Sequence, residues 1–213
     1  SLVGVDINEY LLTEGSKIAQ DQNFKVNPFF KDNSQPLRSN LKPNELNLSY
    51  SDATNISFPD NFFDAVYSVT VLEECDAQKS IAEIKRVLKP GGVAGIVVRA
   101  LDAPQWWNIK VSDSVNKIIS VPPQMVSPKG VADMSLYEKI KLANFKNILS
   151  YPFWFTASSG NNSYIYDMYY GRARQLLNNK QKEEFDTEIK NVNEKSQSIL
   201  SVPLHCCIGY KKK

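Results

Sequence analysis

The segment from Phe63 to Arg99 constrains the fold of this chain more than any other part of the sequence. Phe63–Val71 is rich in β-branched and aromatic residues, which predicts a buried strand. Asp76 can cap a following helix, and Lys89-Pro90-Gly91-Gly92 ends it, because proline cannot continue a helix and glycine accepts a left-handed turn. Val93–Arg99 predicts a second buried strand. This succession of strand, helix and strand predicts a right-handed crossover and a parallel sheet.

The same alternation extends to both sides of this segment. Leu2–Ile7 predicts a buried strand, and Asn8 can cap the helix after it. Phe24–Leu46 combines prolines, asparagines and mixed charge, which predicts an irregular excursion with one short element near Pro36–Leu41. The remaining elements are expected in this order: a weak strand at Leu46–Tyr50, a helix at Ser135–Asn144, a strand at Lys146–Thr156, helices within Tyr164–Ser198 and a closing strand at Leu200–Lys211.

Length and composition favour one domain over residues 1–213, in which residues 101–130, rich in proline, tryptophan and serine, form a cap or lid. A net charge of +2 does not indicate a nucleic-acid-binding protein. No apolar run approaches the roughly 20 residues of a membrane span. Three cysteines, two of them adjacent, favour a reducing, cytoplasmic location over a disulfide framework, and their spacing predicts no metal site.

Two acidic residues follow predicted parallel strands and are candidates for nucleotide binding. Asp6 ends the first strand, where a carboxylate can accept hydrogen bonds from both hydroxyls of a ribose. An aspartate at this point can equally well stop the strand and cap the next helix. Asp52 follows the strand at Leu46–Tyr50, and its carboxylate can accept a hydrogen bond from the exocyclic amine of adenine. A lone Asp-Ala pair most often forms a turn, so the context of Asp52 decides its interpretation.

That context is the stretch SDATNISFPDNFFDAVYSVTVLEE followed by IAEIKRVLKPGG. It resembles the class I S-adenosylmethionine-dependent methyltransferases, most closely the subgroup of ubiquinone and menaquinone C-methyltransferases. The resemblance covers about the first half of the chain, and the second half matches only in the order of its elements. It implies a doubly wound, Rossmann-like α/β fold with a mostly parallel seven-stranded sheet, strand order 3-2-1-4-5-7-6 and an antiparallel last strand.

The resemblance also implies which residues bind S-adenosylmethionine. It implies that Asp6, with the adjacent Ile7, binds the ribose and that Asp52-Ala53 binds adenine. Ser68-Val69 would face the methionine part of the cofactor. In the same family a first strand and a Gly-x-Gly loop precede the segment at Leu2, so we expect this chain to be an N-terminally truncated domain. Without that strand, two parallel strands would flank an empty slot with unpaired backbone groups.

The predicted activity is methyl transfer to a small-molecule acceptor by in-line displacement, which depends mainly on alignment in a dry cavity. The sequence identifies no catalytic residue, and for the single histidine, His205, a structural role is favoured over that of a base. Trp106, Trp107 and Tyr151 are the candidate acceptor contacts, although ordinary packing also explains such aromatic residues.

Two other functions fit parts of the pattern. A non-catalytic methyltransferase-like binding or scaffold protein would tolerate the absent glycine loop. A dinucleotide-dependent oxidoreductase also uses an acidic residue after its second strand. The RVLKPGG turn and the Ser-Asp-Ala segment argue against the oxidoreductase. The sequence indicates neither the acceptor atom nor the oligomeric state.

Overall fold

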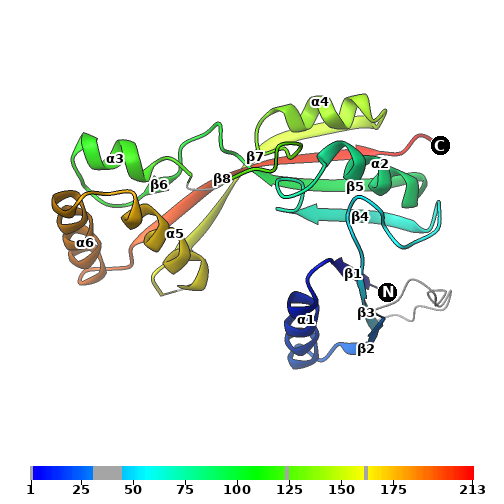
Figure 1. The fold of residues 1–213 in the computed structure, drawn as a ribbon, viewed down its shortest axis with the longest axis horizontal. Helices are drawn as coiled ribbons and strands as arrows, with labels where there is room; N and C mark the ends of the chain where they lie inside the picture. Colours follow the sequence, from blue (N-terminus) through cyan, green and yellow to red (C-terminus); the bar gives the residue numbers. More distant parts are fainter. Residues whose placement is uncertain (1, 31–44, 123–124, 161–162) are drawn as a thin grey trace.

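The structure is a computed structural model that describes residues 2–30, 45–122, 125–160 and 163–213. These residues form two β-sheets with helices packed against them (Figure 1). The smaller sheet is parallel throughout, in the order β1-β3-β2. Its strands are β1 (Leu2–Asp6), β2 (Lys25–Phe30) and β3 (Glu45–Tyr50).

The larger sheet is built around β5 and β8. β4 runs parallel to β5, β8 runs antiparallel to β5, and β7 and β6 both pair with β8 in the antiparallel direction. The series β4-β5-β8-β7 therefore has the predicted order 4-5-7-6, with the predicted antiparallel strand in third place. The strands of this sheet are β4 (Phe63–Val69), β5 (Leu88–Arg99), β6 (Trp106–Trp107), β7 (Lys146–Ser158) and β8 (Ile199–Tyr210).

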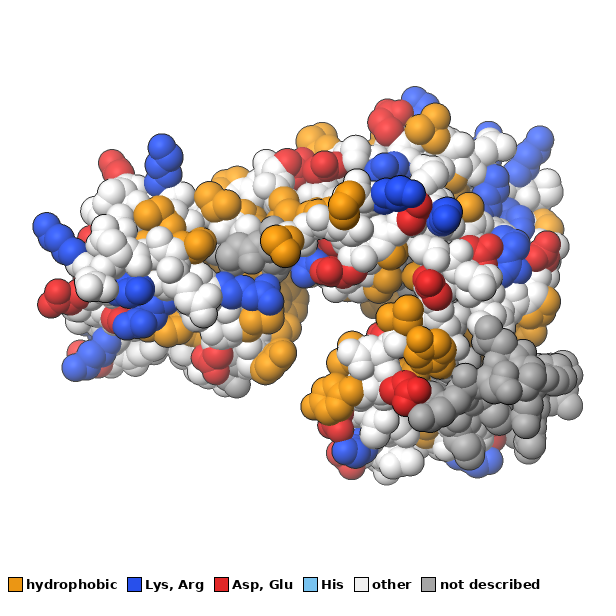
Figure 2. All heavy atoms as spheres, viewed as in Figure 1, with side chains coloured by type: hydrophobic (Ala, Val, Ile, Leu, Met, Phe, Trp, Pro, Cys, Tyr) orange, Lys and Arg blue, Asp and Glu red, His pale blue; other side chains and the backbone are white. Residues whose placement is uncertain are grey.

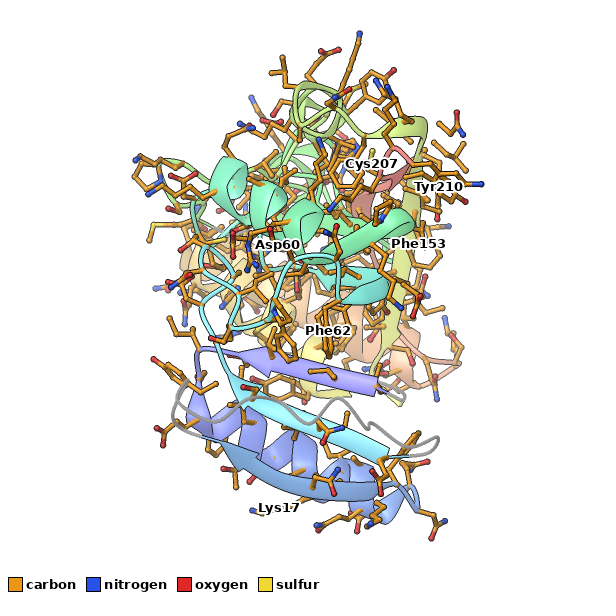
Figure 3. The ribbon with its side chains drawn as sticks, turned by 90° about the vertical axis from the view of Figure 1, so that its right-hand side faces the viewer. Lys17, Asp60, Phe62, Phe153, Cys207 and Tyr210 are labelled. Atoms are coloured by element: carbon orange, nitrogen blue, oxygen red, sulfur yellow. The ribbon has the colours of Figure 1, made fainter. Side chains whose placement is uncertain are left out.

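The two sheets are separated between β1 and β4. In the part of the chain that the structure describes, no strand pairing joins them. This is the place in the predicted strand order where a further strand would lie. Val3 of β1 packs against the core of the larger sheet, and Phe62 lies at the boundary between the two parts (Figure 3). Figure 2 shows hydrophobic side chains exposed around the hollow that separates the smaller sheet from the rest of the molecule.

Helix α1 (Glu9–Asp21) lies against the smaller sheet. It begins where expected, because the side chain of Asn8 accepts a hydrogen bond from the backbone N–H of Tyr10 at 3.0 Å. Leu12 of this helix packs with Leu46 and Leu48 of β3. The buried core of this part is therefore small.

Helices α2 (Ala77–Val87) and α4 (Ser135–Leu142) cover one face of the larger sheet. Asp76 caps α2 as predicted, since its carboxylate accepts a hydrogen bond from the N–H of Lys79 at 3.1 Å. Gly91 has the predicted positive φ, 80°, but α2 ends at Val87 and β5 already begins at Leu88, so the glycine lies within the strand, where the register against β4 shifts. The covering side chains include Ile81 and Ile84 of α2 and Leu136 and Ile140 of α4.

Three further helices form a lobe around the far ends of β7 and β8 (Figure 1). Its core contains Trp107, Tyr166 and Phe185, whose rings meet edge to face. Residues 101–130, which the sequence predicts as a cap, contribute β6 and a helix to this lobe. The helices are α3 (Asp113–Ile119), α5 (Ser163–Gln175) and α6 (Asn179–Asn193).

One expected element is wrong. The sequence predicts an irregular chain across Phe24–Leu46, yet Lys25–Phe30 forms β2 and pairs with β3. Cross-strand contacts stabilise this pairing: the Lys25 ammonium lies 2.8 Å from the Glu45 carboxylate, and the Asn27 amide donates to Asn47 at 2.8 Å. No local pattern reveals such a strand, because its partners are about 20 residues away. The short element expected near Pro36–Leu41 lies outside the described residues.

Candidate functional site

Asp6 and Asp52 come to the same edge of the smaller sheet. Asp6 is the last residue of β1 and lies opposite Tyr50 of β3. The N–H of Ser51 donates to the carbonyl oxygen of Asp6 at 3.0 Å, which holds the two strand ends together. Neighbouring strands lie about 4.8 Å apart. The two carboxylates therefore follow adjacent parallel strands at their carboxyl ends, the edge where nucleotides bind in open α/β sheets.

Local hydrogen bonds orient both carboxylates. Asp6 Oδ1 accepts from the N–H of Asn8 at 2.7 Å, while Asn8 itself caps α1. Asp52 Oδ1 accepts from the N–H and the hydroxyl of Thr54, at 2.7 and 2.8 Å. Asp52 thus does form a turn, as a lone Asp-Ala would, and this turn holds its side chain at the exposed edge. Ile7 and Ala53 lie beside the two carboxylates in sequence, and Ile7 is exposed.

Ser68 and Val69 lie in the other sheet, at the end of β4. They pair with Ile96 and Val97 of β5. Ser68 is partly buried and Val69 is 40% exposed. The residues that the sequence predicts to bind the cofactor are therefore divided between two sheets, and the break between β1 and β4 lies between them.

A buried carboxyl group lies just beyond β4. Glu73 is fully buried, and its Oε1 accepts from the N–H of Arg99 at 2.7 Å. Its Oε2 has no hydrogen-bond partner among the described residues. Burial raises the pKa of Glu73, and the hydrogen bond and charge of Arg99 oppose this only in part. Arg99 also forms an ion pair with Glu74, a residue that we interpret as structural.

His205 and Asp102 form a pair at the carboxyl end of β5. His205 Nε2 lies 2.7 Å from Asp102 Oδ1, and the N–H of Met134 donates to Asp102 Oδ2 at 3.0 Å. Burial opposes ionisation of Asp102, but the hydrogen bonds from His205 and Met134 outweigh it and lower its pKa. Sequence reasoning missed this pair because its members are 103 residues apart. In the sequence, the only indication of this pair was that His205 is the single histidine.

The three candidate acceptor residues are not brought together. Trp106 is 54% exposed and lines a cavity in the lobe, whereas Trp107 is 5% exposed and lies in the lobe core. Consecutive residues of a strand point to opposite faces, which explains this division. Tyr151 is exposed on β7 and lies three residues from the cavity-lining Trp154, so the two point to opposite faces.

The described residues contain no cluster of histidine, cysteine or acidic side chains suited to a metal ion. Among the same residues, no helix combines the length and apolar character needed to cross a membrane.

Comparisons with known proteins connect this geometry to one class of enzyme. Residues 1–96 match a protein-family model described as a methyltransferase domain. A sterol 24-C-methyltransferase of Gibberella zeae is 48% identical over 54 residues, which cover 25% of this chain and 14% of that protein. A sterol 24-C-methyltransferase of Yarrowia lipolytica is 29% identical over 97 residues, covering 45% of this chain and 21% of that protein. The matched part thus spans about a fifth or less of these curated relatives.

Solved structures give the fold. A methyltransferase candidate from Bacillus halodurans aligns with a TM-score of 0.57 at 14% identity, over 100% of this chain and 84% of that one. A phosphoethanolamine N-methyltransferase of Haemonchus contortus in complex with S-adenosyl-L-methionine aligns with a TM-score of 0.50 at 16% identity, over 99% of this chain and 43% of that one. The chain has the Rossmann-like class I methyltransferase fold, which confirms the predicted fold class.

The family match and the fold together support the predicted enzyme class, a methyltransferase, and its predicted cofactor, S-adenosylmethionine. The predicted quinone methyltransferase subgroup is not confirmed, because the curated relatives named above are sterol methyltransferases.

Proposed function

We propose that this chain is part of an S-adenosylmethionine-dependent methyltransferase that acts on a small molecule. The observation that carries the proposal is the placement of Asp6 and Asp52 at adjacent strand ends, within the segment that matches the methyltransferase family model. Asp6 would accept hydrogen bonds from the ribose hydroxyls, with Ile7 beside it. Asp52-Ala53 would contact adenine, and Ser68-Val69 the methionine part.

The residues at this edge fit such a cofactor. Two carboxylates on neighbouring parallel strands supply acceptors for a ribose and an adenine amine, both of which are donors. The edge strands β1 and β4 have no pairing partner across the break in the described residues. This supports the expectation that a further strand completes the sheet and the cofactor site, so the chain studied alone should bind the cofactor weakly.

When bound, the cofactor supplies a methyl group on a sulfonium, whose neutral thioether is a good leaving group. The chain therefore has to align the acceptor and exclude water, and it needs a base only for an acceptor with a weakly acidic proton. The His205–Asp102 pair at the carboxyl end of β5 can take such a proton.

An apolar small molecule is the acceptor that the surroundings favour. Trp106 and Tyr151 both keep exposed aromatic surface, Trp106 on β6 beyond the end of β5 and Tyr151 on β7, which pairs with β8. The relatives named for sterol methylation support the same class. Trp107, which is buried, would act by holding Trp106 in place rather than by direct contact.

The cofactor assignment is tested by calorimetry of S-adenosylhomocysteine binding to the full natural chain. Because charge-assisted hydrogen bonds contribute about 1.5–3 kcal/mol, Asp6→Ala should raise the Kd by about 10- to 100-fold. Asp21→Ala, an exposed aspartate at the opposite end of α1, is the matched control and should leave the Kd unchanged. Failure of the unaltered protein to bind, or equal Kd values for Asp6→Ala and Asp21→Ala, would contradict the proposal and favour a non-catalytic relative.

A further inference from the structure

The lobe contains a cavity of about 560 Å³ between β6, α3 and the far ends of β7 and β8. This volume lies within the range of roughly 300–1,000 Å³ that is typical of small-molecule sites. Trp106 and Trp154 both line the cavity and keep 54% and 48% of their surface exposed. Two half-exposed indoles on one cavity offer a large apolar surface to a flat molecule.

One residue that lines the cavity carries a buried acceptor that lacks a partner among the described residues. Gln105 lines the cavity and is 2% exposed, and its amide Nε2 donates to the carbonyl oxygen of Ile119 at 2.6 Å. Trp107 Nε1 donates to the same carbonyl oxygen at 3.2 Å. Since a carbonyl only accepts, the amide nitrogen of Gln105 must face Ile119, which fixes the orientation of the amide. The amide oxygen then has no hydrogen-bond partner among the described residues.

An acceptor that is buried without a donor costs about 1–3 kcal/mol, and a ligand that brings a donor recovers part of this cost. The other polar groups that line the cavity are neutral: Asn116, Ser120 and Ser201. None of the lining residues in the described structure is charged, so the site offers no carboxylate or ammonium to neutralise an ionic ligand.

We propose that this cavity binds a flat, uncharged molecule that stacks on Trp106 and Trp154 and donates one O–H or N–H to Gln105 Oε1. The site lies apart from the residues proposed for the cofactor. Ser201 precedes, by three residues, the Leu204 that pairs with Arg99 at the end of β5, which places the cavity about 10 Å beyond that strand end. The proposal does not depend on methyl transfer.

The test uses three probes on the full chain without cofactor, with binding measured by calorimetry. 2-Naphthol carries the donor, 2-methoxynaphthalene keeps the rings and the oxygen but lacks the donor, and 2-naphthyltrimethylammonium adds a positive charge. 2-Naphthol should bind about 10-fold more tightly than the methoxy compound, the value of one net hydrogen bond. It should also bind more tightly than the cation. Absence of 2-naphthol binding, or a preference for either of the other two probes, would overturn the proposal.

Two variants and a matched control locate the site. Trp154→Ala should weaken 2-naphthol binding at least about 10-fold, because it removes one stacking surface. Phe153→Ala is the control: Phe153 is the next residue on β7, is 51% exposed and points to the opposite face, so the Kd should stay within about twofold. Gln105→Leu should abolish the preference for 2-naphthol over the methoxy compound. Equal losses from Trp154→Ala and Phe153→Ala, or an unchanged preference in Gln105→Leu, would refute the site.

Discussion

The two faces of the larger sheet differ in what covers them. On one face Ala94, Ile96 and Val98 of β5 are each at most 1% exposed, because α2 and α4 pack against them. On the other face Tyr67 is 78% exposed and Phe153 51% exposed. The open face also carries Val69, Leu149 and Tyr151, which are each about 40% exposed or more.

This difference shows that the apolar character of a strand does not by itself tell which of its faces is covered. The sequence of β5 reads as a strand buried on both faces, as is usual for parallel sheets with helices on either side. In the described residues the helices α2 and α4 cover only one of them. Large apolar surface left open on a sheet commonly marks a place where another segment or molecule packs.

The largest expected effect is on the covered face. Ile96→Ala removes a side chain that is 1% exposed and leaves a cavity beneath α2 and α4. We expect the free energy of unfolding to fall by about 2–5 kcal/mol, measured by urea denaturation. If the free energy of unfolding fell by less than about 1 kcal/mol, the covered face would be loosely packed and would not differ from the open face in its packing.

A smaller, pH-dependent effect is expected from the buried carboxyl group of Glu73, which contacts Arg99 at the end of β5. Burial raises the folded-state pKa of Glu73 above its ordinary value of 4.5, so folding favours the protonated form. The stability that depends on this proton is present below pH 4.5 and is lost as the pH rises through the folded pKa. Urea midpoints of the wild type should therefore fall, relative to those of Glu73→Gln, as the pH rises above 4.5. Glu74→Gln, on an exposed neighbour, is the control. A pH-independent difference between wild type and Glu73→Gln would contradict this prediction.

The smallest effect is expected on the open face. Tyr67→Ala should change the free energy of unfolding by no more than about 0.5 kcal/mol, because Tyr67 is 78% exposed. The same urea series used for Ile96→Ala measures it. A loss of 2 kcal/mol or more would show that something covers this face in solution, and it would remove the difference between the two faces.

Local chemistry made several features predictable from sequence. Asn8 and Asp76 cap the helices that follow them, and Gly91 adopts the positive φ expected of a glycine in the KPGG segment. Each of these depends on a short side chain or a missing Cβ acting on backbone groups only a few residues away. The positions of Asp6 and Asp52 at adjacent strand ends were also predictable, because parallel strands end at one edge of a sheet.

Features that join distant segments could not be predicted. His205 and Asp102 form a pair although they are 103 residues apart in the sequence. Strand β2 forms because it pairs with β3, whose residues lie about 20 positions later in the chain. The sequence likewise presents Trp106 and Trp107 as one aromatic patch. Because consecutive residues of a strand point to opposite faces, Trp106 lines a cavity and Trp107 lies in the core of the lobe.

Most helices and strands, β2 excepted, could be predicted from the amino-acid sequence, because periodicity, capping and turn chemistry act over a few residues. The family resemblance added the fold class and the sheet edge that Asp6 and Asp52 share. The three-dimensional packing was needed to show where the sheet divides, which face of the larger sheet is covered and which aromatic side chains line the same cavity. Those outcomes depend on packing between segments far apart in the chain. The unpartnered oxygen of Gln105 is an example. The amide nitrogen of Gln105 donates to the carbonyl oxygen of Ile119, which leaves the amide oxygen buried without a donor within the described part of the chain.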